Sequence, residues 1–173
     1  LSVATPDELP QDKIIICQAI ADKPEAEKLK DTQILRDAVK ELNDPRLELQ
    51  IIKGFPNREC LKKKRKAHIV FDHMQGYFGV SSLESLAQGK VVMAGLNRSI
   101  LYHMYEWLDF KFNMKNRPPW VIAQNKSDLK HWIKFYANNQ DAREFISNYS
   151  AGWMRRWWGE QRIVNKLLEI YNK

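Results

Sequence analysis

A turn marked by two glycines is the part of the sequence best suited to chemistry. Gly76 and Gly79 let a ligand approach the backbone closely. The unpaired N–H groups and the dipole at the start of the following helix favour an anion such as phosphate. Glu84, further along that helix, has a carboxylate that can accept hydrogen bonds from ribose hydroxyls. The alternative is a tight strand-to-helix turn with a solvated glutamate, and the spacing leaves both open. The candidate binding residues are Gly76, Tyr77, Phe78, Gly79, Val80, Ser81, Ser82 and Glu84.

Short apolar segments of strand length surround this turn. His68–Phe71 precedes it, and Val91–Ala94 follows the helix, which Gly89 ends. The segment from Lys13 to Ile20 is apolar and β-branched almost throughout, as a strand covered on both faces requires. Two further strands are predicted at Leu47–Lys53 and Trp120–Ala123.

Segments with helical spacing separate these strands. Glu25–Leu42 has a regular apolar face, and Asn57 is the predicted N-cap of a short basic helix that ends near Lys66. Further helices are predicted at 100–110, from a cap at Ser127 or Asp128 to Tyr136, at 141–149 and at 152–171.

This alternation of strands and helices predicts an α/β fold with a Rossmann-like, open and mainly parallel sheet, helices on both faces and long C-terminal helices. Ligands bind at the carboxyl ends of the strands in such sheets, which is where the glycine turn is predicted to lie.

The segment around the turn resembles the donor-binding segment of the C-terminal domain of nucleotide-sugar-dependent glycosyltransferases of the two-Rossmann-domain (GT-B) architecture, the glycosyl transferases group 1 type. The family pattern is Glu-Gly-Phe-Gly-x4-Glu-Ala-x-Ala-x-Gly-x-Pro-Val. The matching positions here are Phe78, Gly79, Glu84, Ala87, Gly89 and Val92. Asp72, Gly76, Tyr77 and Gly79 also resemble a variant of the motif, Asp-Gln-x3-Gly-Trp-Tyr-Gly.

The resemblance extends along nearly the whole chain. Lys30-Asp31-Thr32 resembles the Lys-Gly-Thr of the family, whose lysine contacts the donor phosphate, and the segment from Asp141 to Tyr171 resembles the closing helices. The departures from the family patterns include Gly76 in place of the first glutamate, Val91 in place of proline and Asp31 in place of glycine. The resemblance therefore implies phosphate and ribose binding more directly than sugar recognition or turnover.

The resemblance implies that the chain is the donor-binding half of a glycosyltransferase that transfers a sugar from a nucleotide-diphosphate sugar. Lys30 would stabilise the leaving group, although an ordinary exposed helix lysine is the alternative. The acceptor base would come from a missing N-terminal acceptor domain. Because no Asp-x-Asp motif occurs, a metal-independent reaction without a cofactor is expected. The expected division is a linker at 1–12, a nucleotide-sugar-binding domain at 13–150, and a C-terminal helix at 151–173 with an inter-domain contact.

The formal charge of +7 is concentrated in one segment. Seven basic residues and one acid lie between Lys53 and His68, which leaves 21 basic and 20 acidic residues elsewhere. The cluster can be a solvated helix face, a contact with anionic lipids, or a nucleic-acid footprint, and the last is disfavoured because no aromatic residues alternate with the lysines. A non-catalytic Rossmann-like module that docks through this helix is the alternative function. The cluster residues are Arg58, Lys62, Lys63, Lys64, Arg65 and Lys66.

Other patterns narrow the class of protein. The longest apolar stretch, Val91–Leu96, is far too short to span a membrane, so no transmembrane helix is expected. The expected location is cytoplasmic, with the basic cluster as a peripheral contact at the inner face of the membrane. The four histidines and two cysteines have no metal-ligand spacing, and both cysteines are expected to be reduced thiols. The aromatic stripe near Trp153 and Trp157 is expected to face the core, with part of it at a domain interface.

Overall fold

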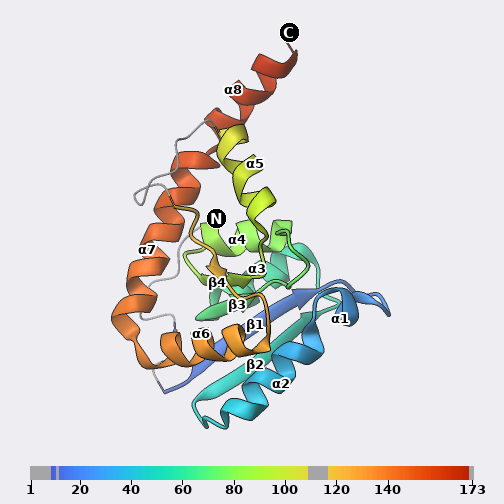
Figure 1. Cartoon of the computed structure of the whole chain (residues 1–173), viewed down its shortest axis with the longest axis vertical. Coiled ribbons are helices and arrows are strands. Elements are labelled where there is room, and N and C mark those ends of the chain that lie inside the picture. Colours follow the sequence, from blue (N-terminus) through green and yellow to red (C-terminus); the bar gives the residue numbers. More distant parts are fainter. Residues whose placement is uncertain (1–8, 11, 109–116, 172–173) are drawn as a thin grey trace.

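The computed structural model describes residues 9–10, 12–108 and 117–171 (Figure 1). Most of the expected linker at 1–12, and the expected helix end at Phe110, lie outside the described residues.

A parallel sheet forms the centre of the molecule (Figure 1). Over the described residues it has five strands in the order β2-β1-β3-β4-β5, and every neighbouring pair is parallel. The predicted open parallel sheet is therefore confirmed. The strands are β1 (Ile14–Ile20), β2 (Leu47–Lys53), β3 (Ile69–Phe71), β4 (Val91–Ala94) and β5 (Val121–Ile122).

Helices cover both faces of this sheet, as predicted. Alternate residues of the strands point to opposite faces, so Ile14 and Ile16 pack on one side while Ile15 and Cys17 pack on the other. The helices are α1 (Ala26–Leu29), α2 (Thr32–Leu42), α3 (Asn57–Arg65), α4 (Val80–Ala87), α5 (Arg98–Leu108), α6 (Lys126–Asn138), α7 (Gln140–Trp157) and α8 (Glu160–Tyr171).

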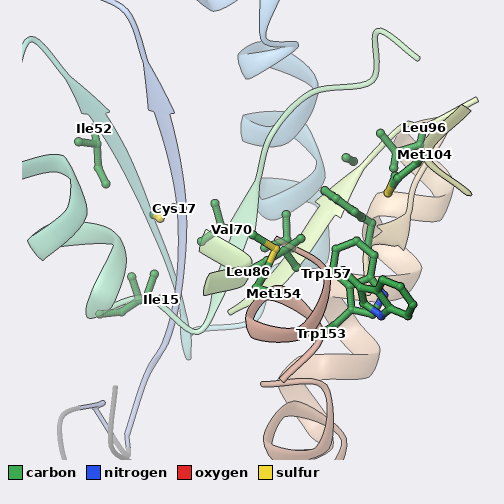
Figure 2. Packing of buried hydrophobic residues seen from close by; sticks show 14 residues of the cluster. Ile15, Cys17, Ile52, Val70, Leu86, Leu96, Met104, Trp153, Met154 and Trp157 are labelled. Atoms are coloured by element: carbon green, nitrogen blue, oxygen red, sulfur yellow. The ribbon is translucent and has the colours of Figure 1, made fainter. Parts of the chain in front are cut away.

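Two hydrophobic clusters fill the space between the sheet and its helices. One cluster joins the sheet to α2 and α6, through residues such as Leu35 and Ile133. The other joins it to α4, α5 and the second half of α7, through Leu86, Met104 and Trp153 (Figure 2). Trp153 and Trp157 are buried there, which confirms that the aromatic stripe faces the core.

The predicted helix from Glu25 to Leu42 is wrong as a single element, because the structure has two helices with a break at Lys30-Asp31. Asp31 has φ = +54°, a left-handed conformation that interrupts regular hydrogen bonding. The break places Lys30 and Asp31 at the carboxyl edge of the sheet, next to the residues that follow β3.

Three predicted helix ends are also corrected. Pro56 precedes α3 in place of Asn57, and Asn125 caps α6 by accepting a hydrogen bond from the Asp128 amide at 2.9 Å. The last two helices divide at Trp158-Gly159, so α7 continues through the break expected between residues 149 and 152. Any side chain at Gly159 would place its Cβ 2.6 Å from the Arg155 carbonyl oxygen, so only glycine fits this division without a shift.

Candidate functional site

The glycine turn lies at the carboxyl edge of the sheet, between β3 and α4. Gly76 has φ = +87°, a conformation that favours glycine, and its carbonyl oxygen accepts a hydrogen bond from the Asn97 amide at 2.9 Å. This bond ties the turn to the chain that leaves β4. Gly79 is the N-cap of α4, with an extended backbone that directs the helix start toward the same edge.

Asp72, which directly follows β3, occupies the start of α4. Its Oδ2 accepts hydrogen bonds from the Gly79 amide at 2.8 Å and from the Ser82 hydroxyl at 2.7 Å. Its Oδ1 forms an ion pair with Lys30 Nζ. The Asp72 side chain is 1% exposed. Burial alone would raise the pKa of Asp72, but the Lys30 ammonium and the Gly79 amide together hold it below its usual value. Asp72 is therefore a buried carboxylate anion.

The break between α1 and α2 positions Lys30 for this contact. Asp31 accepts hydrogen bonds from the Met74 amide at 2.7 Å and from the Gln75 side chain, so it fixes the chain between β3 and the glycine turn. Gln18, buried in β1, donates to the Lys30 carbonyl at 2.6 Å and to the Asp72 carbonyl at 3.0 Å. These contacts join three segments that are far apart in the sequence.

Glu84 lies on another side of α4 and is also paired. Its Oε2 is 2.6 Å from Lys64 Nζ, and its Oε1 accepts a hydrogen bond from Asn57 Nδ2 at 3.1 Å. Lys64 also donates to the carbonyl and hydroxyl oxygens of Ser81 at 3.3 Å. Because Glu84 remains 20% exposed and a carboxylate has about four acceptor sites, it can still receive hydrogen bonds from a ligand.

Lys64 does not belong to an exposed basic surface, which corrects the expectation for this residue. Its side chain is 1% exposed and points into the contact between α3 and α4. Arg65 is half-buried, and the other members of the basic cluster are exposed. The exposed basic face therefore consists of Arg58, Lys62, Lys63 and Lys66.

The first turn of α4 contains two backbone amides that a ligand could use. Within the described part of the chain, the N–H groups of Val80 and Ser81 have no hydrogen-bond acceptor, and Val80 is exposed. We call these two groups the outer amides. The Lys30 ammonium, the Gly79 N–H and the Ser82 hydroxyl all contact Asp72, and we call them the inner donors.

The remaining candidate residues have different surroundings. Tyr77 is exposed and its ring lies 4.5 Å from that of His73, centroid to centroid. The Phe78 ring instead packs on that of Trp120, with 4.9 Å between the centroids, as part of a hydrophobic cluster. Phe78 therefore anchors the turn to the core. The buried His73 has a pKa below its usual value because burial disfavours its charged form. His73 therefore adds no positive charge to the site near neutral pH.

Four site residues were missed by the sequence reasoning: Gln18, Asn57, Asp72 as a hydrogen-bond acceptor, and Lys64 as a buried cation. Asp72 carried a signal, because a carboxylate directly after a buried strand lies at the binding edge. The spacing indicates more weakly that Lys64 is buried, because Lys64 lies four residues after the half-buried Cys60 and so shares its helix face.

Among the described residues, no group of three or more His, Cys, Asp or Glu side chains is arranged to hold a metal ion. No helix in the described ranges is both long and apolar enough to cross a bilayer.

No protein-family model and no curated protein matches this chain. Solved structures do resemble it. The C-terminal domain of a glycosyl transferase group 1 family protein from Francisella tularensis has a TM-score of 0.62 at 16% identity, covering 89% of this chain and 90% of that one. The catalytic domain of cholesterol-α-glucosyltransferase from Helicobacter pylori has a TM-score of 0.58 at 14% identity, covering 80% and 95%.

A third similar structure, described as a UDP-N-acetylglucosamine 2-epimerase from Listeria monocytogenes, has a TM-score of 0.53 at 14% identity, and the match covers 84% of this chain and 46% of that protein. At these identities the likeness establishes the fold alone. The chain has the Rossmann-like fold of the C-terminal half of a GT-B glycosyltransferase, as the sequence predicted.

Proposed function

We propose that this chain is the donor-binding domain of a glycosyltransferase that uses a nucleotide-diphosphate sugar. The observation that carries the proposal is the position of α4. Its outer amides open at the carboxyl edge of a parallel sheet, with Lys30 beside Gly79 and Glu84 on the adjacent side of the helix. The glycosyltransferase fold supports the same assignment.

Each group has a chemical role in this proposal. The outer amides and Lys30 bind the diphosphate, and Glu84 accepts hydrogen bonds from the ribose hydroxyls. As the glycosidic bond breaks, negative charge grows on the nucleoside diphosphate, and the Lys30 ammonium stabilises it. The acceptor and its base belong to a separate N-terminal domain, and the reaction needs no metal ion or other cofactor.

Calorimetric titration with UDP-, GDP- and ADP-sugars tests this function. We expect one of them to bind, with unchanged affinity when a chelator is present. If the folded protein binds none of the three, it is not a donor-binding domain for these sugars.

A substitution at Glu84 tests the ribose contact. Glu84→Gln keeps the size of the side chain and an acceptor, but it loses the charge that strengthens hydrogen bonds from hydroxyl groups. We expect weaker binding of the nucleoside diphosphate and unchanged binding of inorganic pyrophosphate, which has no ribose. Equal loss for both ligands would mean that Glu84 acts through the fold of α4 instead.

The exposed basic face of α3 supports a second function, docking on an anionic membrane surface. Phe55 is 46% exposed, and Lys63 Nζ lies 4.4 Å from the centre of its ring, so an apolar side chain accompanies the positive charges. Each basic residue near an anionic surface contributes about 1 kcal/mol. This function is compatible with donor binding, and also with a non-catalytic module.

Co-sedimentation with vesicles tests the docking function. We expect binding to phosphatidylcholine vesicles that contain phosphatidylserine, no binding to phosphatidylcholine alone, and loss of binding on combined Lys62→Gln, Lys63→Gln and Lys66→Gln substitution. A control triple substitution at the exposed Lys28, Lys40 and Lys134 removes the same charge elsewhere. Equal loss in both variants would show a general charge effect and no specific surface.

A further inference from the structure

We propose that Asp72 competes with the ligand for the inner donors and thereby sets which anions the site accepts. This inference rests on the proposed function, in which the start of α4 binds the diphosphate. It concerns a buried carboxylate that carries the same charge as the ligand and occupies hydrogen-bond donors at the start of α4.

The geometry of Asp72 is that of a bound anion. One carboxylate oxygen accepts hydrogen bonds from the Gly79 amide at 2.8 Å and from the Ser82 hydroxyl at 2.7 Å, and the other accepts one from the Lys30 ammonium. These distances are typical of hydrogen bonds to a charged acceptor. A phosphate oxygen at the same position would need the same three donors, so the carboxylate and a phosphate exclude each other there.

The charges around Asp72 also disfavour the binding of a phosphate at this position. Asp72 and Lys30 neutralise each other, and Asp31 adds a further negative charge to the chain beside them. A diphosphate that approaches α4 therefore meets no net positive charge from these three residues. Because Asp72 is almost fully buried, solvent screens its repulsion of an incoming phosphate only weakly.

With Asp72 in place, a ligand phosphate is held by the outer amides and by the N–H groups of Lys30 that do not face Asp72. The Gly79 amide, the Ser82 hydroxyl and the Lys30 N–H that faces Asp72 are then not available to the ligand. Removal of the Asp72 charge weakens the hydrogen bond from the Gly79 amide and makes the full charge of Lys30 available to the ligand, so the affinity for a diphosphate rises.

The decisive variant is Asp72→Asn, which keeps the side-chain size and an oxygen acceptor. The probe is inorganic pyrophosphate, titrated into the full chain by calorimetry. We expect the variant to bind it at least about tenfold more tightly than the unsubstituted protein. The control is Asp22→Asn, which removes an equal charge from an exposed position at the same edge, next to Gly54. Equal or weaker binding by Asp72→Asn, or no binding by either protein, overturns the proposal.

A measurement on the unsubstituted protein keeps the test valid if the variant does not fold. In amide chemical-shift titrations with pyrophosphate, we expect the Val80 and Ser81 signals to move and the Gly79 signal to stay. A Gly79 shift as large as those of Val80 and Ser81 would overturn the proposal, as would no shift at Val80 and Ser81.

Nucleotides separate this inference from the proposed function. If UDP-, GDP- or ADP-sugars bind the unsubstituted protein and Asp72→Asn equally, donor binding stands and the competition by Asp72 fails. If pyrophosphate behaves as expected while no nucleotide or nucleotide sugar binds either protein, the role of Asp72 stands and the donor-binding function fails.

Discussion

Lys64 on α3 and Glu84 on α4 form an ion pair, with 2.6 Å between Nζ and Oε2. The lysine side chain is 1% exposed, so its charge has been removed almost completely from water. Two oxygens of Ser81 accept further hydrogen bonds from the same ammonium group. The pair therefore fixes the proposed ribose-binding carboxylate and joins the basic helix to the site.

Loss of this ion pair is expected to destabilise the fold. Lys64→Met keeps the length of the side chain but leaves Glu84 without its cation, and breaking such a buried pair costs about 3 kcal/mol. Urea unfolding measures the change in free energy. Lys66→Met, an exposed position at the end of the same helix, is the control and is expected to change stability by less than about 0.5 kcal/mol. Equal effects would mean that Lys64 acts only as one of many surface charges.

The stability of the protein is expected to fall between pH 7 and pH 5 because of His68. Burial, with Arg143 and Lys90 nearby, lowers the pKa of His68 to about 4 from an ordinary value of 6.5. Its Nδ1 accepts a hydrogen bond from the Ile15 amide at 3.0 Å, which requires the neutral ring.

The unfolded chain therefore binds a proton in this range that the folded protein does not. The free energy of unfolding has its full value above about pH 6.5, is lower by about 2 kcal/mol at pH 5, and falls further as the pH approaches 4. Urea unfolding at pH 7 and pH 5 checks this. His68→Asn should reduce the difference between the two pH values, and an unchanged difference would assign it to other groups.

Two glycine-to-alanine substitutions are expected to change the stability of the protein in opposite directions. A Cβ at Gly95 would lie 2.7 Å from the Met74 Cα and 3.1 Å from the Ala123 carbonyl oxygen, so Gly95→Ala forces backbone atoms apart and costs about 1–3 kcal/mol. Gly152 lies inside α7 with no atom within 4 Å of a Cβ, so Gly152→Ala should stabilise by about 0.5–1 kcal/mol. Thermal unfolding of both variants measures the two effects, and a shift of the same sign in both would contradict the prediction.

The two cysteines are expected to react at very different rates. Burial raises the pKa of the Cys17 thiol to about 12 from 9.0, despite the nearby Lys64 and Lys90, so its thiolate fraction near pH 8 falls about a thousandfold. Cys60 is only half-buried. A thiol reagent should modify one cysteine in the native protein and both after denaturation. Cys60→Ser should remove the fast reaction, and rapid labelling of that variant would contradict the burial of Cys17.

The strands were predictable because their residues carry the pattern of elements buried on both faces. In β1, neighbouring isoleucines enter different clusters, so consecutive positions are apolar, with the hydrogen-bonded Gln18 as the exception. The order of strands and helices then limited the fold to an open parallel sheet. The break at Asp31 was not predictable from apolar spacing, because the helical pattern continues through it while the backbone conformation changes at one residue.

The contacts of the site were less accessible to sequence reasoning. The glycine turn and Glu84 were found through residue types and spacing, and Lys30 through the family resemblance, but their partners were not found. Lys30 meets Asp72 from 42 positions away, and Lys64 meets Glu84 from 20 positions away. Such pairs depend on the packing of separate elements, and in a run of five basic residues only the spacing from Cys60 indicates that Lys64 is buried.

Helix α7 contributes to both hydrophobic clusters, one with each of its halves. Ala142 and Ile146 pack with the residues of α2 and α6, whereas Trp153 and Trp157 pack with those of α4 and α5. During synthesis the cluster at α2 and α6 cannot be completed until the chain has grown past Ile146, and the cluster at α4 and α5 not until it has grown past Trp157. A nascent chain that ends before α7 therefore exposes apolar surface on both sides of the sheet. The two clusters should therefore form and be lost in one cooperative step, with slow amide exchange that extends across both.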